Sequence, residues 1–195
     1  MFYRPVTSEQ REAVRKRYDL PEQYLVAVGT IEERKNQEAL VRAMALLPDA
    51  LHLVIVGRRT QYYDRVAAAV ETLGLGHRVH CLEGVRFEDF PALYAEARLS
   101  LYVSFFEGFG IPVLESLCCG TPVVAAQRSS LPEVGGQAAV YADPSSPQSI
   151  ASQVDRILSD ADSYQQLVAA APMQAQRFSR AAIIDDLMKV YKALL

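Results

Sequence analysis

Short apolar runs alternate along this chain with longer stretches in which apolar residues recur at helical spacing. The short runs are rich in valine and leucine, and six of them are predicted to be buried strands: residues 24–29, 51–56, 79–82, 99–104, 122–126 and 138–141. Helices are predicted between them, at residues 34–47, 62–73, 90–97 and 112–119. Alternation of this kind predicts an α/β fold with a parallel sheet and helices on both of its faces.

The two ends of the chain are predicted to be helical. Ser8 and Glu9 open a helix at residues 11–18, and Pro21 marks the turn that follows it. Three helices are predicted to pack on the sheet after it ends: residues 147–158, residues 163–178 with a break at Pro172, and residues 180–195. The chain is therefore predicted to form one domain over residues 1–195, with three parts: an opening helix and linker at 1–22, a Rossmann-like, doubly wound core of about six parallel strands at 23–144, and C-terminal helices at 145–195.

Composition narrows the class of protein. Half of the 195 residues are hydrophobic and 22% are charged, which is ordinary for a globular protein. The formal net charge of -3 argues against broad nucleic-acid binding, which needs a basic surface. No apolar run approaches the roughly 20 residues that span a bilayer, so no transmembrane segment is predicted. Three cysteines are too few for a disulfide framework and show no metal-ligand spacing, so we expect a cytoplasmic protein without a structural metal.

The turn after the first predicted strand, residues 29–36, places Arg34 and Lys35 at the expected start of a helix. A helix N-terminus carries partial positive charge, so two cations there are unfavourable unless an anion lies nearby. A bound diphosphate would supply that anion. Alternatively, both side chains point into solvent, with Glu32 and Glu33 partly neutralising them, and this motif alone leaves both interpretations open.

The turn after the fourth predicted strand runs from Glu107 through Gly108 and Gly110 into a helix that begins near Pro112. Glycine lets a backbone approach a phosphate closely, and the free N–H groups of a helix N-terminus can donate to it. Ligands of doubly wound sheets bind outside the carboxyl ends of the strands, where this turn is expected to lie. Glu107 and Glu115 bracket it. Glutamates at this spacing are usually surface residues, and only the glycine-bearing loop between them favours a site.

These segments resemble the C-terminal domain of family 4 glycosyltransferases, which are retaining enzymes with the GT-B fold. The most specific part, residues 106–116, is similar to the family's Glu-x7-Glu signature. It is followed by two further matching stretches, Gly120-Thr121-Pro122-Val123-Val124 and Leu131-Pro132-Glu133-Val134. Supporting stretches are residues 29–36, 54–57, 82–85 and 141–144. The resemblance covers nearly the whole chain and implies one half of a GT-B fold, which binds a nucleotide sugar.

The resemblance also implies roles for single residues. Glu107, Arg34 and Lys35 would be catalytic: Glu107 would hydrogen-bond hydroxyls of the donor sugar, and the two cations would neutralise its diphosphate, so that no metal or other cofactor is expected. Glu115 would accept from the ribose, and Val85 would lie near the base. The implied donor-binding set is Glu115, Gly108, Phe109, Gly110, Val113, Leu114, Gly29, Thr30 and Val85. Many family members carry arginine at the position of Thr30, so Arg34 is expected to supply that charge.

GT-B enzymes have two Rossmann-like domains with the active site between them, and the resemblance covers only the second. We therefore expect an acceptor-binding domain in the same chain or a partner chain, and little or no sugar transfer without it. The implied donor is GDP-mannose, with UDP and dTDP sugars as alternatives. The implied acceptor is a surface glycan or lipid-linked sugar, which leaves peripheral association of the full enzyme with the inner face of the membrane open. Two other functions are weighed: a noncatalytic nucleotide-sugar-binding module and a sugar-nucleotide epimerase.

Overall fold

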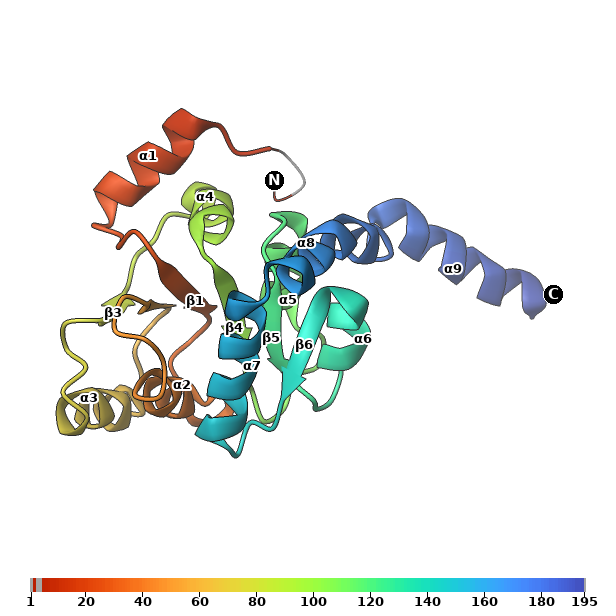
Figure 1. Ribbon diagram of the computed structural model, residues 1–195. Coiled ribbons are helices and arrows are strands. Elements are labelled where there is room, and N and C mark those ends of the chain that lie inside the picture. The colour runs from red at the N-terminus through yellow and green to blue at the C-terminus, as the bar shows by residue number, and fades with distance from the viewer. Residues whose placement is uncertain (1, 3–4, 195) are drawn as a thin grey trace.

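A computed structural model describes residue 2 and residues 5–194. Its centre is a six-stranded sheet in which every neighbouring pair is parallel, in the order β3-β2-β1-β4-β5-β6 (Figure 1). The strands are β1 (Tyr24–Val28), β2 (His52–Val56), β3 (Val79–Leu82), β4 (Leu99–Tyr102), β5 (Val123–Ala126) and β6 (Ala139–Ala142). The order reverses between β1 and β4, which makes the sheet doubly wound. The predicted fold class is confirmed, and no strand end differs from the predicted one by more than two residues.

Helices cover both faces of the sheet (Figure 1). One face is covered by α2 (Gln37–Met44), α3 (Tyr63–Thr72) and α7 (Pro147–Ser159). The other is covered by α1 (Ser8–Arg17), α4 (Phe90–Glu96), α5 (Ile111–Cys118), α6 (Leu131–Gly135) and the C-terminal half of α8 (Ala161–Gln176). The remaining elements are α9 (Arg180–Ala193) and three 3-10 turns, η1 (Glu33–Lys35), η2 (Phe87–Asp89) and η3 (Gly136–Ala138).

The central strand β1 explains why the strands read as continuous apolar runs. Leu25 and Ala27 are buried against α2 and its neighbours, whereas Tyr24 and Val26 are buried against α1 and α4 on the opposite face. A strand covered on both faces has no position at which a polar side chain reaches water. Its sequence is therefore apolar throughout and does not alternate.

The first helix starts earlier than predicted because its cap is Thr7. The Thr7 hydroxyl accepts a hydrogen bond from the Gln10 amide, and the Gln10 side chain accepts one from the Thr7 amide. This reciprocal pair is a capping box, which satisfies two amides at the helix start. Ser8 is consequently the first helical residue. Residues 1, 3 and 4 of the predicted opening segment lie outside the described residues.

The structure departs from the sequence analysis at two of the later helices. Helix α8 runs through Pro172 without a break, because Ala171 and Ala175 are buried on either side of it and hold the helix against the core. This packing offsets the roughly 3 kcal/mol that an interior proline costs. Helix α6 was not predicted at all, because five residues are too few to show a helical period.

The last helix does not pack on the sheet as predicted. Within α9, no residue is buried, and the helix extends away from the rest of the molecule (Figure 1). Its large apolar side chains remain exposed, among them Ile183, Leu187 and Tyr191. Leu195, which the sequence assigns to this helix, lies outside the described residues. Across the described part of the chain, none of the helices is long and apolar enough to cross a bilayer.

Candidate functional site

The turn after β1 holds the two predicted cations. The single helix predicted at residues 34–47 is wrong: Arg34 and Lys35 lie in η1, and Asn36 adopts a left-handed conformation with φ 60° before α2 begins. The buried Asn36 side chain donates to the carbonyl oxygens of Val103, at 3.3 Å, and Pro144, at 2.7 Å. These bonds fix the η1 turn against the ends of two other strands. Arg34 and Lys35 therefore lie before the helix and not in its first turn.

Sheet order brings the turn after β4 beside the turn after β1, because β1 and β4 pair directly. The two turns are also joined by hydrogen bonds. The Phe105 amide donates to the Arg34 carbonyl at 2.9 Å, and the Arg34 guanidinium donates to the Phe106 carbonyl at 2.7 Å. Both turns lie at the carboxyl ends of neighbouring strands where the winding reverses, which is where doubly wound sheets bind ligands.

Glu107 is the centre of this site. One of its carboxylate oxygens, Oε1, lies 2.7 Å from Lys35 Nζ and 2.8 Å from Arg34 Nη1, and the residue is only 8% exposed. Burial opposes ionisation of the carboxyl, but contacts with Lys35, Ser104 and Arg34 outweigh burial and lower the pKa of Glu107. Glu107 is therefore a carboxylate at neutral pH, paired with both cations.

The cations of the site are balanced within the chain. Arg34 also pairs with Glu32, at 2.6 Å, so two positive side chains face two negative ones. An anionic ligand that reaches Arg34 or Lys35 must share them with Glu107 or replace it. The alternative interpretation of this turn is right only for Glu32, which neutralises Arg34, because Glu33 pairs with Arg65 and the Lys35 side chain is only 12% exposed. That a diphosphate binds to these cations stays a prediction.

Serine hydroxyls hold the loop that carries Glu107. The Glu107 amide donates to Ser129 Oγ at 3.0 Å. The Ser130 hydroxyl lies 3.0 Å from the Glu107 carbonyl and 2.8 Å from the Phe109 carbonyl, and it can donate to either. Both serines follow β5, so a third strand end contributes to the position of the loop.

The start of α5 borders the same loop. Gly110 caps the helix with φ 106°, and a Cβ atom there would lie 2.7 Å from Leu131 Cδ2, so no other residue fits without displacing Leu131. The amides of Val113 and Leu114 donate to the Gly110 carbonyl and are not free for a ligand. Within the described chain, the amides of residues 108–110 donate to no acceptor, which leaves them available to an anion.

Glu115 lies on α5 and accepts a hydrogen bond from the hydroxyl of Tyr94, at 3.1 Å. Burial raises the pKa of Glu115, and the Tyr94 bond offsets this only in part. Burial, and then the Glu115 charge, also hold the pKa of Tyr94 well above its usual range, so Tyr94 remains a donor. A carboxylate can accept at both oxygens, so Glu115 can accept further hydrogen bonds from ligand hydroxyls.

Three further residues of the predicted donor-binding set, Gly29, Thr30 and Val85, do not share one environment. A Cβ atom at Gly29 would lie in ordinary contact with the Lys35 side chain, at 3.5 Å, but the φ of 144° there disfavours any residue that carries a side chain. The Thr30 carbonyl accepts from Gln37 at 2.9 Å. Val85 is half-buried against the core under α1 and α4. No contact that the structure describes joins Val85 to Glu107 or Lys35.

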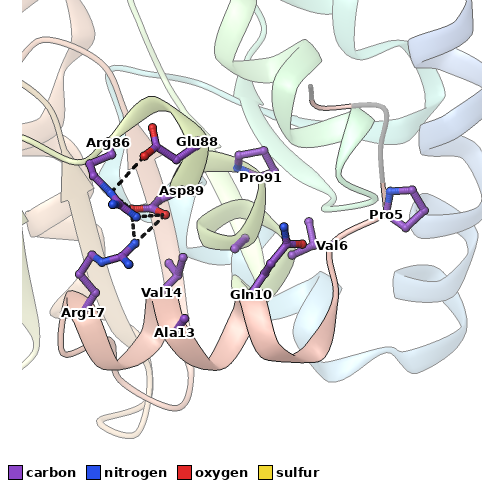
Figure 2. Close-up of a pocket in the computed structure, with 11 residues that line it drawn as sticks. Pro5, Val6, Gln10, Ala13, Val14, Arg17, Arg86, Glu88, Asp89 and Pro91 are labelled. Carbon is purple, nitrogen blue, oxygen red and sulfur yellow. Dashed lines mark hydrogen bonds and ion pairs between the residues drawn. The ribbon is translucent and has the colours of Figure 1, made fainter.

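A cavity of about 640 Å³ lies between α1 and the start of α4, and none of the predicted site residues lines it. Figure 2 shows Arg17 and Arg86 converging on Asp89 at one side of it. Burial favours the neutral Asp89 carboxyl, but hydrogen bonds from Arg86, Tyr18 and Arg17 overcome it and lower the pKa of Asp89 to about 2. This cluster attaches α1 to the rest of the fold.

Sequence reasoning missed the residues that support the site, chiefly Asn36, Tyr94, Tyr102, Ser129 and Ser130. Tyr102 ends the strand directly before the Glu107 loop, so its position was a usable signal. The other four gave none, because their contacts depend on which strands are neighbours in the sheet.

The fold and the site together define a Rossmann-like domain with a cluster of cations and a carboxylate at its switch point. Residues 9–174 match the family model described as glycosyl transferases group 1, and the chain belongs to that family.

One relative, O-antigen chain mannosyltransferase B of Escherichia coli, is 36% identical, and the match covers 98% of this chain and 52% of that protein. The chain thus spans about half of that relative's length. Anabaena Alr3699/HepE in complex with UDP and glucose is similar in structure, with a TM-score of 0.86 and 24% identity over 98% of this chain and 54% of that one. The C-terminal domain of LpcC, a glycosyl transferase group 1 family protein from Francisella tularensis, has a TM-score of 0.77 and 19% identity over 91% of this chain and 95% of that one.

Proposed function

We propose that this chain is the donor-binding half of a retaining hexosyltransferase and that it holds a nucleoside diphosphate sugar, GDP-mannose in the first instance. The observation that carries the proposal is the convergence of Lys35 and Arg34 on Glu107, beside the free amides of residues 108–110. Cations and free amides together suit a diphosphate, and a carboxylate beside them suits sugar hydroxyls. The mannosyltransferase relative supports mannose as the sugar.

The chemistry follows from where charge develops. Breaking the bond between the anomeric carbon and the diphosphate oxygen leaves negative charge on the departing diphosphate. Lys35, Arg34 and the amides of residues 108–110 stabilise that charge, and such preorganised stabilisation is usually the largest single contribution to catalysis. Glu107 orients the sugar through its hydroxyls, and Glu115 accepts from the ribose. The acceptor attacks from the face that the diphosphate leaves, which retains the configuration. That this chemistry needs no metal ion stays a prediction.

A second, acceptor-binding unit is part of the proposal. The loop that bears Glu107 exposes large apolar side chains, including Phe106, at 63%, and Ile111, at 61%. Clustered exposed apolar residues of this size mark surfaces that other protein covers. The relative from Escherichia coli is about twice as long as the matched region. We therefore propose that a unit in cis or trans covers this rim and α9, supplies the acceptor site and excludes water. We further propose that the protein acts in the cytoplasm, and at the inner face of the membrane when its acceptor is a lipid-linked sugar.

Calorimetric titration of the purified chain with GDP, UDP and GDP-mannose tests the proposal. We expect one base to bind, and we expect Lys35→Ala and Glu115→Ala to weaken its binding by at least about tenfold. Lys189→Ala, which removes an exposed lysine on α9, is the matched control and should bind like the unmodified chain. Failure of all three ligands to bind would contradict a donor site in this chain. Binding without transfer, even when the acceptor unit is present, would favour a noncatalytic nucleotide-sugar module.

A further inference from the structure

Tyr102 makes two contacts with Lys35. It ends β4 and is 4% exposed, and its hydroxyl accepts a hydrogen bond from the Lys35 ammonium. The same ammonium nitrogen lies 4.6 Å from the centre of the Tyr102 ring, within the range of a cation–π interaction. Burial, and then the charge of Glu107, raise the pKa of Tyr102, so its hydroxyl stays protonated and neutral. One side chain thus holds a single cation through both its ring and its hydroxyl.

The surroundings of Lys35 limit where its ammonium can go. The methylene chain passes close to Gly29, and the side chain is 12% exposed. An ammonium group has three N–H donors. One is directed at the Tyr102 hydroxyl, and the nitrogen also forms an ion pair with Glu107 Oε1, 2.7 Å away. The donors that Tyr102 does not engage are left to Glu107 and to a ligand. Free lysine side chains carry about 2 kcal/mol of rotamer entropy, which this arrangement has already removed before a ligand arrives.

We propose that Tyr102 is a positioning residue: it holds the Lys35 ammonium so that the other N–H donors of this group face the diphosphate of the donor. This inference rests on the proposed function for its ligand, but the hold on Lys35 is a property of the chain alone. Tyr102 does not touch the ligand in this account. It acts through Lys35, by fixing the direction in which the cation presents its other donors.

The Tyr102 hydroxyl distinguishes a positioning role from simple packing in the core. The Tyr102 ring packs in the core with Val113, Leu117 and Val123. Phenylalanine would fill that space equally well and would keep the ring under the ammonium. Tyr102→Phe therefore removes the hydroxyl alone, with its hydrogen bond to Lys35 and its contacts with Glu107 and Ser104. If Tyr102 only filled space in the core, Tyr102→Phe would weaken ligand binding very little.

A double-mutant cycle tests the proposal with the nucleoside diphosphate that binds the unmodified chain. We expect Tyr102→Phe to weaken binding about fivefold, which corresponds to about 1 kcal/mol. In a chain that already carries Lys35→Met, Tyr102→Phe should not weaken binding further, because the lysine through which Tyr102 acts is absent. Tyr164→Phe is the matched control, since it removes a hydroxyl that bonds only the Arg98 carbonyl. Equal losses from Tyr102→Phe in both backgrounds would show that Tyr102 does not act through Lys35.

A ligand-free measurement separates this inference from the proposed function. In a chain labelled with ¹⁵N-lysine, we expect the Lys35 ammonium protons to exchange slowly enough to be observed, with Lys35→Met identifying their signal. Tyr102→Phe should accelerate that exchange at least several-fold, whereas Tyr164→Phe should not. Unchanged exchange in Tyr102→Phe would overturn the inference whether or not a nucleotide binds. Accelerated exchange in a chain that binds no nucleotide would support the hold on Lys35 and reject the donor site.

Discussion

The carboxylate of Glu107 lies 2.7 Å from the ammonium nitrogen of Lys35, although the two residues come from turns that follow different strands. The same carboxylate oxygen lies 2.8 Å from Arg34. Glu107 is therefore an internal anion, and it occupies the place beside Arg34 and Lys35 where a ligand phosphate would bind. Under the proposed function, a donor would have to compete with Glu107 for these contacts before Glu107 could bind the sugar.

Removing this internal anion should strengthen the binding of a nucleoside diphosphate that carries no sugar. For Glu107→Gln, we expect about fivefold tighter binding, or about 1 kcal/mol, in calorimetry. Transfer by the complete enzyme should nevertheless fall at least about a hundredfold, because a contact made to the reacting sugar is lost. Glu71→Gln changes an exposed glutamate on α3 and serves as control. Weaker nucleotide binding in Glu107→Gln would mean that Glu107 organises the cations and does not compete for them.

The Asp89 cluster should control how firmly α1 is attached. Arg17 donates to both Asp89 oxygens at 2.8 Å, and Tyr18 donates to one at 2.6 Å. For Asp89→Asn, we expect a loss of about 2 kcal/mol in the free energy of unfolding, because Arg17 loses its ion pair and the buried position 89 loses its charge-assisted hydrogen bonds. Urea denaturation at neutral pH measures this. Asp186→Asn, in an exposed pair on α9, should change stability by less than about 0.5 kcal/mol.

The same carboxylate predicts a pH dependence. Its pKa is about 2 in the folded chain, below the ordinary value of 3.8, so the unfolded chain binds the proton more readily. The stabilisation is therefore fully present above pH 3.8 and is lost as the pH falls through about 2. Denaturation curves between pH 5 and about 2 should converge for the unmodified chain and Asp89→Asn. A constant difference between them over this range would show that the carboxylate charge is not the cause.

Gly57 should tolerate no side chain. A Cβ atom there would lie 1.9 Å from the Gly29 carbonyl oxygen, which is backbone and cannot rotate away. We expect Gly57→Ala to lower the free energy of unfolding by about 3 kcal/mol and to weaken nucleotide binding, because the displaced segment leads into the Lys35 turn. Gly76→Ala is the control: its Cβ atom would meet nothing within 4 Å, so stability should stay equal or rise slightly. Equal stability of the two variants would contradict the close approach.

His52 and His80 should make the sheet sensitive to mild acid. His52 Nδ1 lies 3.0 Å from His80 Nε2, and burial lowers the pKa of both residues. The unfolded chain therefore binds more protons than the folded one near pH 6, so stability should fall as the pH drops through about 6.5. Replacing both residues with glutamine should flatten this slope in denaturation between pH 5 and 7.5. His77→Gln, at an exposed position, should leave the slope unchanged.

Prediction from sequence succeeded where structure depends on neighbours along the chain. Most of the strands and helices were found from their periods, and the Glu107 loop was found because a glycine-bearing turn led into a helix. It failed at Pro172 and at α9, where packing decides the outcome: buried alanines carry α8 through a proline, and α9 has nothing to pack on among the described residues. It failed at Asn36 because a left-handed residue splits an otherwise continuous helical pattern.

By itself the sequence determined the alternation of strands and helices, the parallel sheet and the cation and glutamate turns, because each depends on residues that are close along the chain. Only the tertiary structure decided that the two turns meet. Pairing of β1 with β4 placed Glu107 against Lys35, and it placed Tyr102 beneath the same ammonium. Strand order is set by packing between segments that are distant in the sequence, so the periodic pattern within any one segment does not reveal it.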